Sequence, residues 1–148
     1  TVHMRQKFGS GVIVFHRDEN NNIQFLLVQG YGNFWGFPKG HAENNETHIE
    51  TALRELKEET QIIEIDILSD VKYRESYLIK RKRGPSIYKK ITYFVGEVKE
   101  KRAQRLRSEI KQLAWFDLEY AKQLVVPDKK IILDKVYMSI NDSLRHEE

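Results

Sequence analysis

Three glutamates in one short stretch are the residues of this chain whose type and spacing could do chemistry. Glu55, Glu58 and Glu59 recur at helical spacing, so a helix would place three carboxylates on one face. Like charges four residues apart destabilise a helix by a few tenths of a kcal/mol, and only Arg54 is well placed to offset them. Oxygen ligands of this kind suit a hard divalent ion. A metal site is one reading, and a solvated acidic face, the commoner origin of such clusters, stays open.

The residues around the glutamates predict the helix that positions them. Thr47 as N-cap, with Glu50 as its reciprocal partner three residues on, predicts a helix from His48 to about Thr60. Apolar residues follow at helical spacing and predict a stripe that faces a core: Ile49, Ala52, Leu53 and Leu56.

A fourth carboxylate lies in a predicted strand. Residues 87–98 alternate in polarity as a strand does, and Glu97 is the acidic member of a largely apolar row. A carboxylate in that setting needs a cation or a metal as a partner. Glu97 is also near the strand end, where it could simply reach water, so both readings stay open.

The remaining elements predict one domain of the α/β or α+β class over residues 1–148. The expected strands are Ser10–Phe15 and Ile23–Val28 as a hairpin, then Ile62–Leu68, 71–79, 87–98 and Gln112–Phe116. Helices are expected after Asp117 to about Leu124 and from Pro127 to about Asn141. Residues 38–40 read as a loop before the acidic helix. This order predicts a sandwich of a mixed β-sheet between helices. Residues 1–3, before Met4, are expected to be a cloning remnant.

Composition narrows the class of protein. The net charge of +3 is too small to argue for nucleic acid binding, and the absence of cysteine excludes disulfides and thiolate metal sites. Acids collect in 43–59, whereas 80–83, 89–90 and 99–107 are mostly basic. This division suits a polyanion bridged to protein by metal ions. No apolar run is long enough for a membrane span. We therefore expect a cytoplasmic monomer.

The string from Gly40 to Ile62 resembles the signature of the Nudix hydrolases. It has Gly40, Glu46, Arg54-Glu55-Leu56, Glu58-Glu59 and Ile62 at the family's spacing, with Gln61 where the family usually has glycine. The resemblance implies hydrolysis of a nucleoside diphosphate linked to another group, with Mg²⁺ or Mn²⁺ as cofactor. It implies that Glu55, Glu58, Glu59 and the Gly40 carbonyl bind metal, that Arg54 holds the glutamates and that Glu46 orients the helix. Glu59 or Glu97 would be the general base, and Glu97 a further metal ligand.

The segment from Trp35 to His41 is similar to that of the asymmetrically cleaving diadenosine tetraphosphate hydrolases. That similarity implies phosphate contacts from Lys39 and His41, supplemented by basic residues near Lys82 and Lys89. Candidates for stacking on adenine are Tyr77, Tyr88 and Phe116. Core packing is the alternative for each aromatic residue, and a structural cap is the alternative for His41.

Two other functions remain open at this point. RNA-decapping members of the family share a similar segment, so removal of a 5′ cap or pyrophosphate from RNA is the second reading, with 99–107 as the RNA-binding candidate. A nucleotide-sensing module that does not hydrolyse is the third. The intact glutamates argue against it.

Overall fold

The computed structural model describes residues 5–106 and 108–147. Its elements follow in the order β1 (Arg5–Arg17), β2 (Ile23–Gly30), β3 (Trp35–Gly36), β4 (Lys39–His41), α1 (His48–Thr60), β5 (Asp66–Ile79), β6 (Ile87–Val98), β7 (Ile110–Asp117), α2 (Leu118–Leu124) and α3 (Pro127–Glu147).

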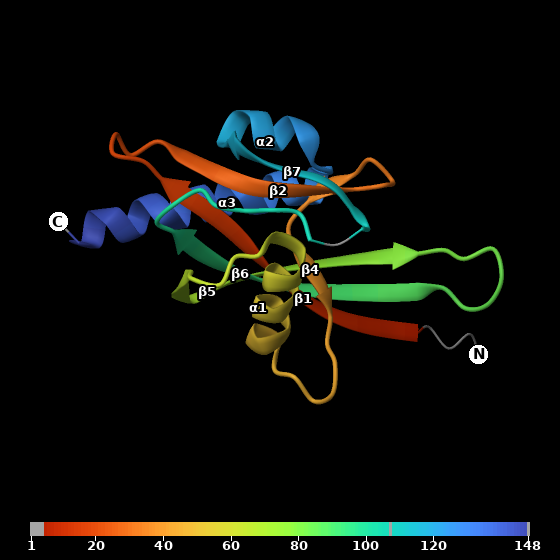
Figure 1. Ribbon diagram of the computed structural model, residues 1–148. Coiled ribbons are helices and arrows are strands. Elements are labelled where there is room, and N and C mark those ends of the chain that lie inside the picture. The colour runs from red at the N-terminus through yellow and green to blue at the C-terminus, as the bar shows by residue number, and fades with distance from the viewer. Residues whose placement is uncertain (1–4, 107, 148) are drawn as a thin grey trace.

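The strands form one mixed seven-stranded sheet with the path β3-β2-β1-β6-β5, to which β7 adds beside β2 and β4 beside β1. Strand β1 pairs in parallel with β6 along nearly its whole length. Its other edge is divided: residues 15–17 pair with β2, and residues 9–11 pair with β4. The sheet therefore forks along β1, and Figure 1 shows β2 and β7 diverging from β5 and β6.

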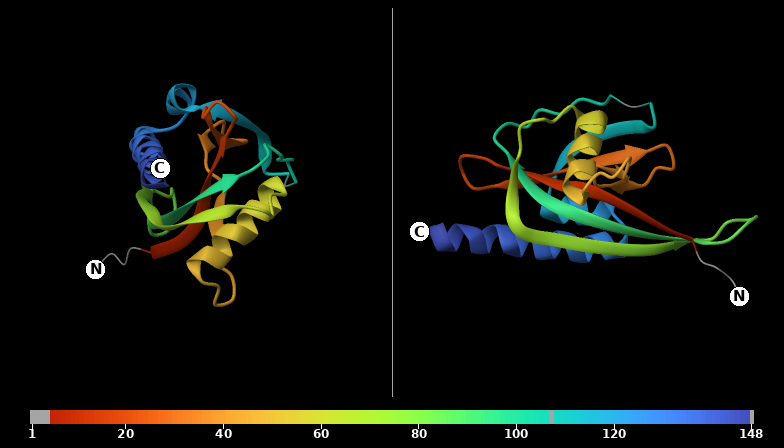
Figure 2. Two further views of the ribbon diagram at one scale, coloured as in Figure 1. Left: turned by 90° about the vertical axis from the view of Figure 1, so that its left-hand side faces the viewer. Right: turned by 90° about the horizontal axis from the view of Figure 1, so that it is seen from below.

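Helices cover both faces of the sheet, as Figure 2 shows with α1 and α3 on opposite sides. One apolar cluster joins α1 to the face that includes Val12, Val14 and Phe94. The other joins α2 and α3 to the face that includes Ile13, Phe15 and Tyr93. Alternation along β1 and β6 explains why neighbouring residues enter different clusters. The predicted sandwich of a mixed sheet between helices is confirmed.

Several predicted boundaries were wrong. Residues 39–41 are a short strand that pairs with β1, where a loop was expected. The two strands predicted over 62–79 form one strand, β5, which starts at Asp66. Its pairing register with β6 shifts between Ile67 and Lys72, and Asp70 within this stretch has a positive φ of 61°. Leu53, predicted to face the core, is 37% exposed. Helix α3 continues to Glu147. Within 5–106 and 108–147, no helix is long and apolar enough to cross a membrane.

Candidate active site

Helix α1 is fixed at both ends by its own sequence. The Thr47 side chain accepts a hydrogen bond from the Glu50 backbone N–H, and the Glu50 carboxylate accepts one from the Thr47 backbone N–H, which completes the predicted capping box. At the other end Gln61 has φ 66°, and its N–H donates to the Lys57 carbonyl. The left-handed conformation that favours glycine is thus adopted by a glutamine.

The helix presses two of its glutamates against the sheet. Glu55 and Glu59 are only 5% and 6% exposed. A Cβ at Gly40 would overlap the Glu55 carboxylate, so only glycine permits this approach. The Lys39 backbone N–H donates to Glu59 Oε2 at 3.2 Å. Strand β4 therefore brings its backbone directly to both carboxylates.

Arg54 ties the acidic residues together. Its Nε donates to Glu46 Oε2 at 2.7 Å, and its Nη2 donates to the His41 carbonyl at 2.9 Å. Its Nη1 donates to Glu55 Oε1 at 2.9 Å and to Glu58 Oε2 at 3.1 Å. The hydrogen bond from Arg54 lowers the pKa of Glu46 to about 2. Arg54 thus contacts Glu46, Glu55 and Glu58 at once.

The Glu59 carboxyl has a strongly raised pKa. Burial and, to a lesser extent, the charge of Glu55 raise this pKa to about 8, although the hydrogen bond from the Lys39 backbone N–H acts to lower it. Glu109, just before β7, adds to the same rise and so lies near enough to interact electrostatically. Sequence reasoning missed Glu109 because no local pattern links it to a helix some 50 positions earlier.

The donor set fits a divalent cation. Three carboxylates and the Gly40 carbonyl are oxygen donors, which hard divalent ions prefer. Among the described residues, no three His, Asp or Glu side chains lie close enough together to hold a metal ion, and Arg54 donates hydrogen bonds to Glu55 and Glu58. The residues would therefore hold an ion only together with other ligands such as substrate phosphates, which is usual for Mg²⁺.

A cleft of about 550 Å³ opens beside Glu59. Its walls include Phe34, Trp35, Phe37, Lys39, Tyr77, Ile110, Val126 and Lys129. Two of the predicted substrate contacts, Lys39 and Tyr77, thus lie in the same cleft as the Glu59 carboxylate.

His41 and Lys89 lie in a cationic group next to this cleft. Burial lowers the pKa of Lys89, and the charges of Lys39 and Lys7 lower it further. The pKa of His41 is also lowered, first by burial and then by Lys89, Lys39 and Lys7. The structure therefore brings together the predicted phosphate contacts Lys39, His41 and Lys89, and adds Lys7, which sequence reasoning did not select.

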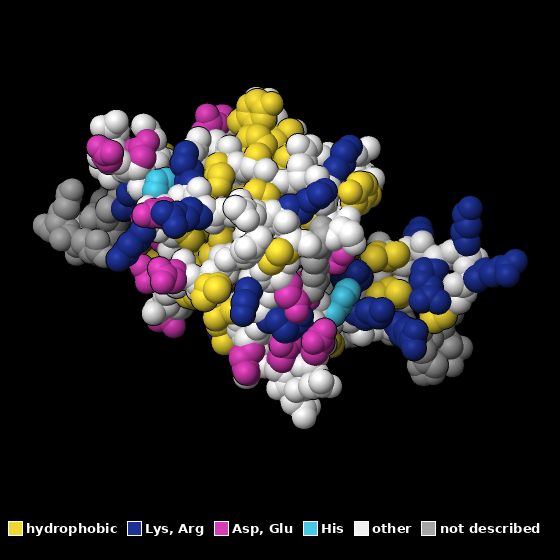
Figure 3. Space-filling model, viewed as in Figure 1, with side chains coloured by type: hydrophobic (Ala, Val, Ile, Leu, Met, Phe, Trp, Pro, Cys, Tyr) yellow, Lys and Arg dark blue, Asp and Glu magenta, His cyan; other side chains and the backbone are white. Residues whose placement is uncertain are grey.

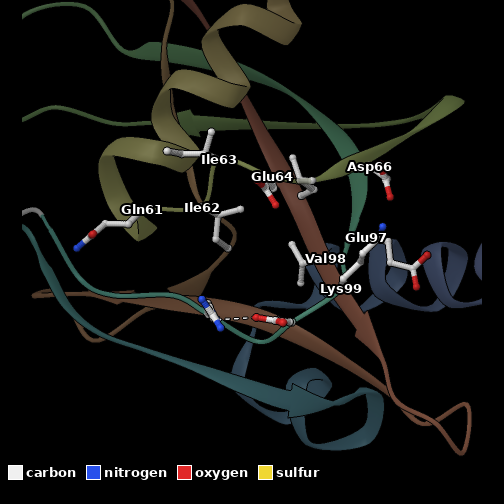
Figure 4. A pocket seen from close by; sticks show the side chains of 11 residues that line it. Gln61, Ile62, Ile63, Glu64, Asp66, Glu97, Val98 and Lys99 are labelled. Carbon is white, nitrogen blue, oxygen red and sulfur yellow. Dashed lines mark ion pairs between the residues drawn. The ribbon is translucent and has the colours of Figure 1, made fainter.

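Glu97 does not join the glutamates of α1, contrary to the prediction of a shared site. It aligns with Phe15 of β1, whereas Gly40 aligns with Ser10, five positions away. At a rise of about 3.3 Å per residue this is roughly 16 Å along the strand. Glu97 instead lines a separate hollow of about 650 Å³ with Glu64 and Asp66 (Figure 4).

Three further candidates also lie outside the cleft. Lys82 follows β5 in the turn at its outer end. Tyr88 points to the sheet face opposite that of Lys89, and its ring centroid lies 5.7 Å from Lys90 Nζ. Phe116 packs edge-on against Trp35 and stacks on Tyr120, both at 5.2 Å between ring centroids. Phe116 therefore supports the cleft wall from behind, which is the core-packing alternative.

A buried ion pair in the cleft was missed. Glu75 is 5% exposed and accepts hydrogen bonds from Lys129 Nζ at 2.9 and 3.0 Å and from the Tyr93 hydroxyl at 3.2 Å. Alternation along 71–79 puts Glu75 on the same face as Tyr73 and Tyr77. Its partner could not be found, because Lys129 comes from α3, 54 positions later.

Comparisons with known proteins agree with this geometry. The NUDIX domain family model matches residues 7–136. The bis(5′-nucleosyl)-tetraphosphatase [asymmetrical] of Mus musculus is 35% identical over 77% of this chain and 81% of its own length. The RNA pyrophosphohydrolase of Pelagibacter ubique is 26% identical over 97% of this chain and 96% of its own length.

Among solved structures, the binary complex of C. elegans Ap4A hydrolase superposes with a TM-score of 0.81 at 24% identity, covering 92% of this chain and 98% of the other. That likeness supports the fold. The family match extends over most of the chain and includes the glutamates of α1. The protein therefore belongs to the Nudix family and is a hydrolase that acts on phosphoanhydride bonds.

Proposed function

We propose that the protein hydrolyses diadenosine tetraphosphate asymmetrically to ATP and AMP in the presence of Mg²⁺ or Mn²⁺. The observation that carries the proposal is that Glu59 and Lys39 line one cleft with aromatic walls, and that Lys39 interacts electrostatically with Lys7, His41 and Lys89 next to it. This combination favours a substrate with a base and several phosphates beyond it.

The two sides of the site suit different parts of the substrate. Aromatic side chains of the cleft, Trp35 and Tyr77, offer surfaces for adenine, and stacking contributes about 1–3 kcal/mol. The ammonium groups of Lys39 and Lys89 would neutralise the phosphates that extend away from it. The scissile bond would then lie near one end of the tetraphosphate, next to Glu59, which explains unequal products.

The carboxylates would divide the chemical work. Glu55, Glu58, Glu59 and the Gly40 carbonyl would hold divalent ions, and Arg54 would keep the carboxylates in register. When bound, a divalent ion neutralises phosphate charge and makes water more nucleophilic. Glu59 would accept the proton of the attacking water, with Glu109 as the nearby carboxylate from outside α1. The bond from water oxygen to the outer phosphorus forms, the bridging P–O bond breaks, and ATP leaves.

Removal of pyrophosphate from RNA 5′ ends is the second candidate function. A terminal triphosphate could use the same carboxylates and lysines, and a relative named RNA pyrophosphohydrolase spans nearly all of the chain. A sensing module without hydrolysis is less consistent with a complete set of carboxylates.

A substrate panel tests these alternatives. The protein is incubated with Mg²⁺ and equal concentrations of diadenosine tetraphosphate, capped RNA, triphosphate RNA and nucleoside triphosphates, and the products are resolved. The proposal expects tetraphosphate cleavage to be fastest. It also expects Glu59→Gln to lose roughly two to three powers of ten in rate, while the matched control Glu97→Gln stays near wild type. Faster cleavage of RNA would reverse the order of the two functions, and no cleavage at all would favour the sensor.

A further inference from the structure

A charged pair lies inside the cleft, away from the solvated surface where many of the lysines and arginines lie. Figure 3 shows Lys and Arg side chains gathered on the surface over the outer ends of β5 and β6. Lys129 instead lines the cleft with a side chain that is 11% exposed, and its partner Glu75 has a side chain that is 3% exposed. Replacing a buried ion pair by apolar residues is often neutral or stabilising, so stability alone does not explain this pair.

Among the described residues, the hydrogen bonds of the pair leave one donor and one acceptor for a ligand. Lys129 Nζ carries three protons, and the two Glu75 oxygens accept from it at 2.9 and 3.0 Å. Glu75 Oε1 also accepts from the Tyr93 hydroxyl at 3.2 Å, whereas Lys129 is the one partner of Oε2 within the described chain. The cleft therefore presents an ammonium proton and a carboxylate oxygen side by side.

The pair lies next to the aromatic surfaces that are proposed to bind the base. Glu75 and Tyr77 are two positions apart in β5, so their side chains point to the same face, roughly 7 Å apart along the strand. Burial raises the pKa of Tyr77, and the charges of Lys129 and Glu75 act on this pKa in opposite directions. Lys129 also passes close to β3, since a Cβ on Gly36 would lie 3.3 Å from Lys129 Cε. A base that stacks on Tyr77 can thus turn one edge towards both charged groups.

Adenine and guanine differ at the position that such a pair would contact. Adenine has an amino donor beside a ring-nitrogen acceptor, whereas guanine has a carbonyl oxygen in place of that amino group. We propose that Glu75 and Lys129 select adenine over guanine, with Glu75 Oε2 accepting from the adenine amino group and Lys129 Nζ donating to the ring nitrogen. This selection rests on the proposed function, because it concerns the base of the same substrate.

Guanine would be rejected by the carboxylate. It would enter the cleft in the same orientation as adenine, because its phosphates reach the same lysines. Its carbonyl oxygen would then face Glu75 Oε2, and neither oxygen has a proton to donate. Leaving a buried polar group unpaired costs roughly a factor of ten to a hundred in an equilibrium constant. Stacking on Trp35 and Tyr77 accepts either purine, so the discrimination depends on the charged pair.

Equilibrium binding tests this selection without hydrolysis. Isothermal titration calorimetry in EDTA measures the Kd of ATP, of GTP and of ATP that is dimethylated on its amino group. The wild-type protein is compared with the double variant Glu75→Gln/Lys129→Met, in which the glutamine can donate or accept and so suits either purine. The matched control is Lys122→Met/Asp134→Asn, which removes another ion pair, with a distance of 3.0 Å, whose members do not line the cleft.

The wild-type protein should bind ATP roughly ten- to hundredfold more tightly than GTP or the dimethylated ATP. The double variant should lose this preference, whereas the control should keep it, and circular dichroism should show that both variants are folded. Equal affinity of the wild-type protein for ATP and GTP would overturn the selection. A preference that persists in the double variant, or one that the control also loses, would overturn it as well.

Steady-state kinetics with Mg²⁺ separates this selection from the proposed function. Diadenosine tetraphosphate should have a lower KM than diguanosine tetraphosphate, with a similar kcat, because the pair contacts the base and not the reacting phosphorus. Cleavage of both dinucleotides with the same KM would refute the selection and leave the proposed function intact. Failure to cleave diadenosine tetraphosphate would refute the proposed function itself.

Discussion

Replacing Lys129 by methionine probes the buried pair at the base of the cleft. Lys129 Nζ lies 2.9 and 3.0 Å from the two oxygens of Glu75, and the side chains are 11% and 3% exposed. Methionine keeps most of the aliphatic volume but, within the part of the chain that the structure describes, leaves the carboxylate with the Tyr93 hydroxyl as its remaining hydrogen-bond partner. Breaking a buried pair by removing one partner costs about 3–5 kcal/mol. Because the pair borders the cleft and water can enter, we expect the lower end, about 3 kcal/mol.

Urea denaturation followed by far-UV circular dichroism at pH 7 measures this cost. The matched control is Lys130→Met, at the neighbouring position, which should change the free energy of unfolding by less than about 0.5 kcal/mol. The double variant Glu75→Gln/Lys129→Met should recover most of the loss, since it no longer leaves a charge unpaired. If Lys129→Met is as stable as wild type, or the double variant is no better than the single one, the assignment of this pair is wrong.

Three further changes test the geometry of α1. Gln61→Gly should stabilise the protein by about 1 kcal/mol in urea denaturation, because Gln61 adopts a left-handed conformation; a loss of stability would contradict this. Gly40→Ala should lower the hydrolysis rate at least tenfold with the fold retained by circular dichroism, because the new Cβ would displace the Glu55 carboxylate; an unchanged rate would refute the close approach. Without metal, the pKa of Glu59 is raised from 4.5 to about 8 in the folded protein. The protonated Glu59 carboxyl therefore contributes to the free energy of unfolding below pH 4.5, and this contribution, up to about 5 kcal/mol, should be lost as pH rises towards 8. Since Mg²⁺ needs the ionised carboxylate, its stabilising effect on thermal unfolding should grow over that pH range, and a pH-independent effect would argue against Glu59 as a ligand.

Local sequence signals predicted most of α1 correctly. The capping box depends on residues three positions apart, and the register of the glutamates depends only on helical spacing, so both could be inferred without the rest of the fold. Arg54 and Glu46 could be selected because the helix and the segment before it are close in sequence, and their roles stay predictions. The effect of Gln61 at the usual glycine position was not predicted, and the structure shows that the glutamine adopts the left-handed conformation itself.

Residues that depend on long-range pairing were predicted less well. Alternation placed Glu97 on the same strand face as Ile91, Tyr93 and Val95. It could not show that Glu97 and Gly40 pair with positions of β1 that are roughly 16 Å apart. The same limit hid Glu109 and the Glu75–Lys129 pair, whose members are distant in sequence. Strand β4 was read as a loop because its pairing partner, β1, precedes it by some 30 residues and three residues carry little pattern of their own.

In the proposed reaction, water attacks an outer phosphorus of diadenosine tetraphosphate held beside Glu59. Hydrolysis with Mg²⁺ in water enriched with oxygen-18, followed by mass spectrometry of the products, shows which phosphorus is attacked. We expect equal amounts of ATP and AMP, with the label in AMP. Two molecules of ADP, or the label in ATP, would contradict it.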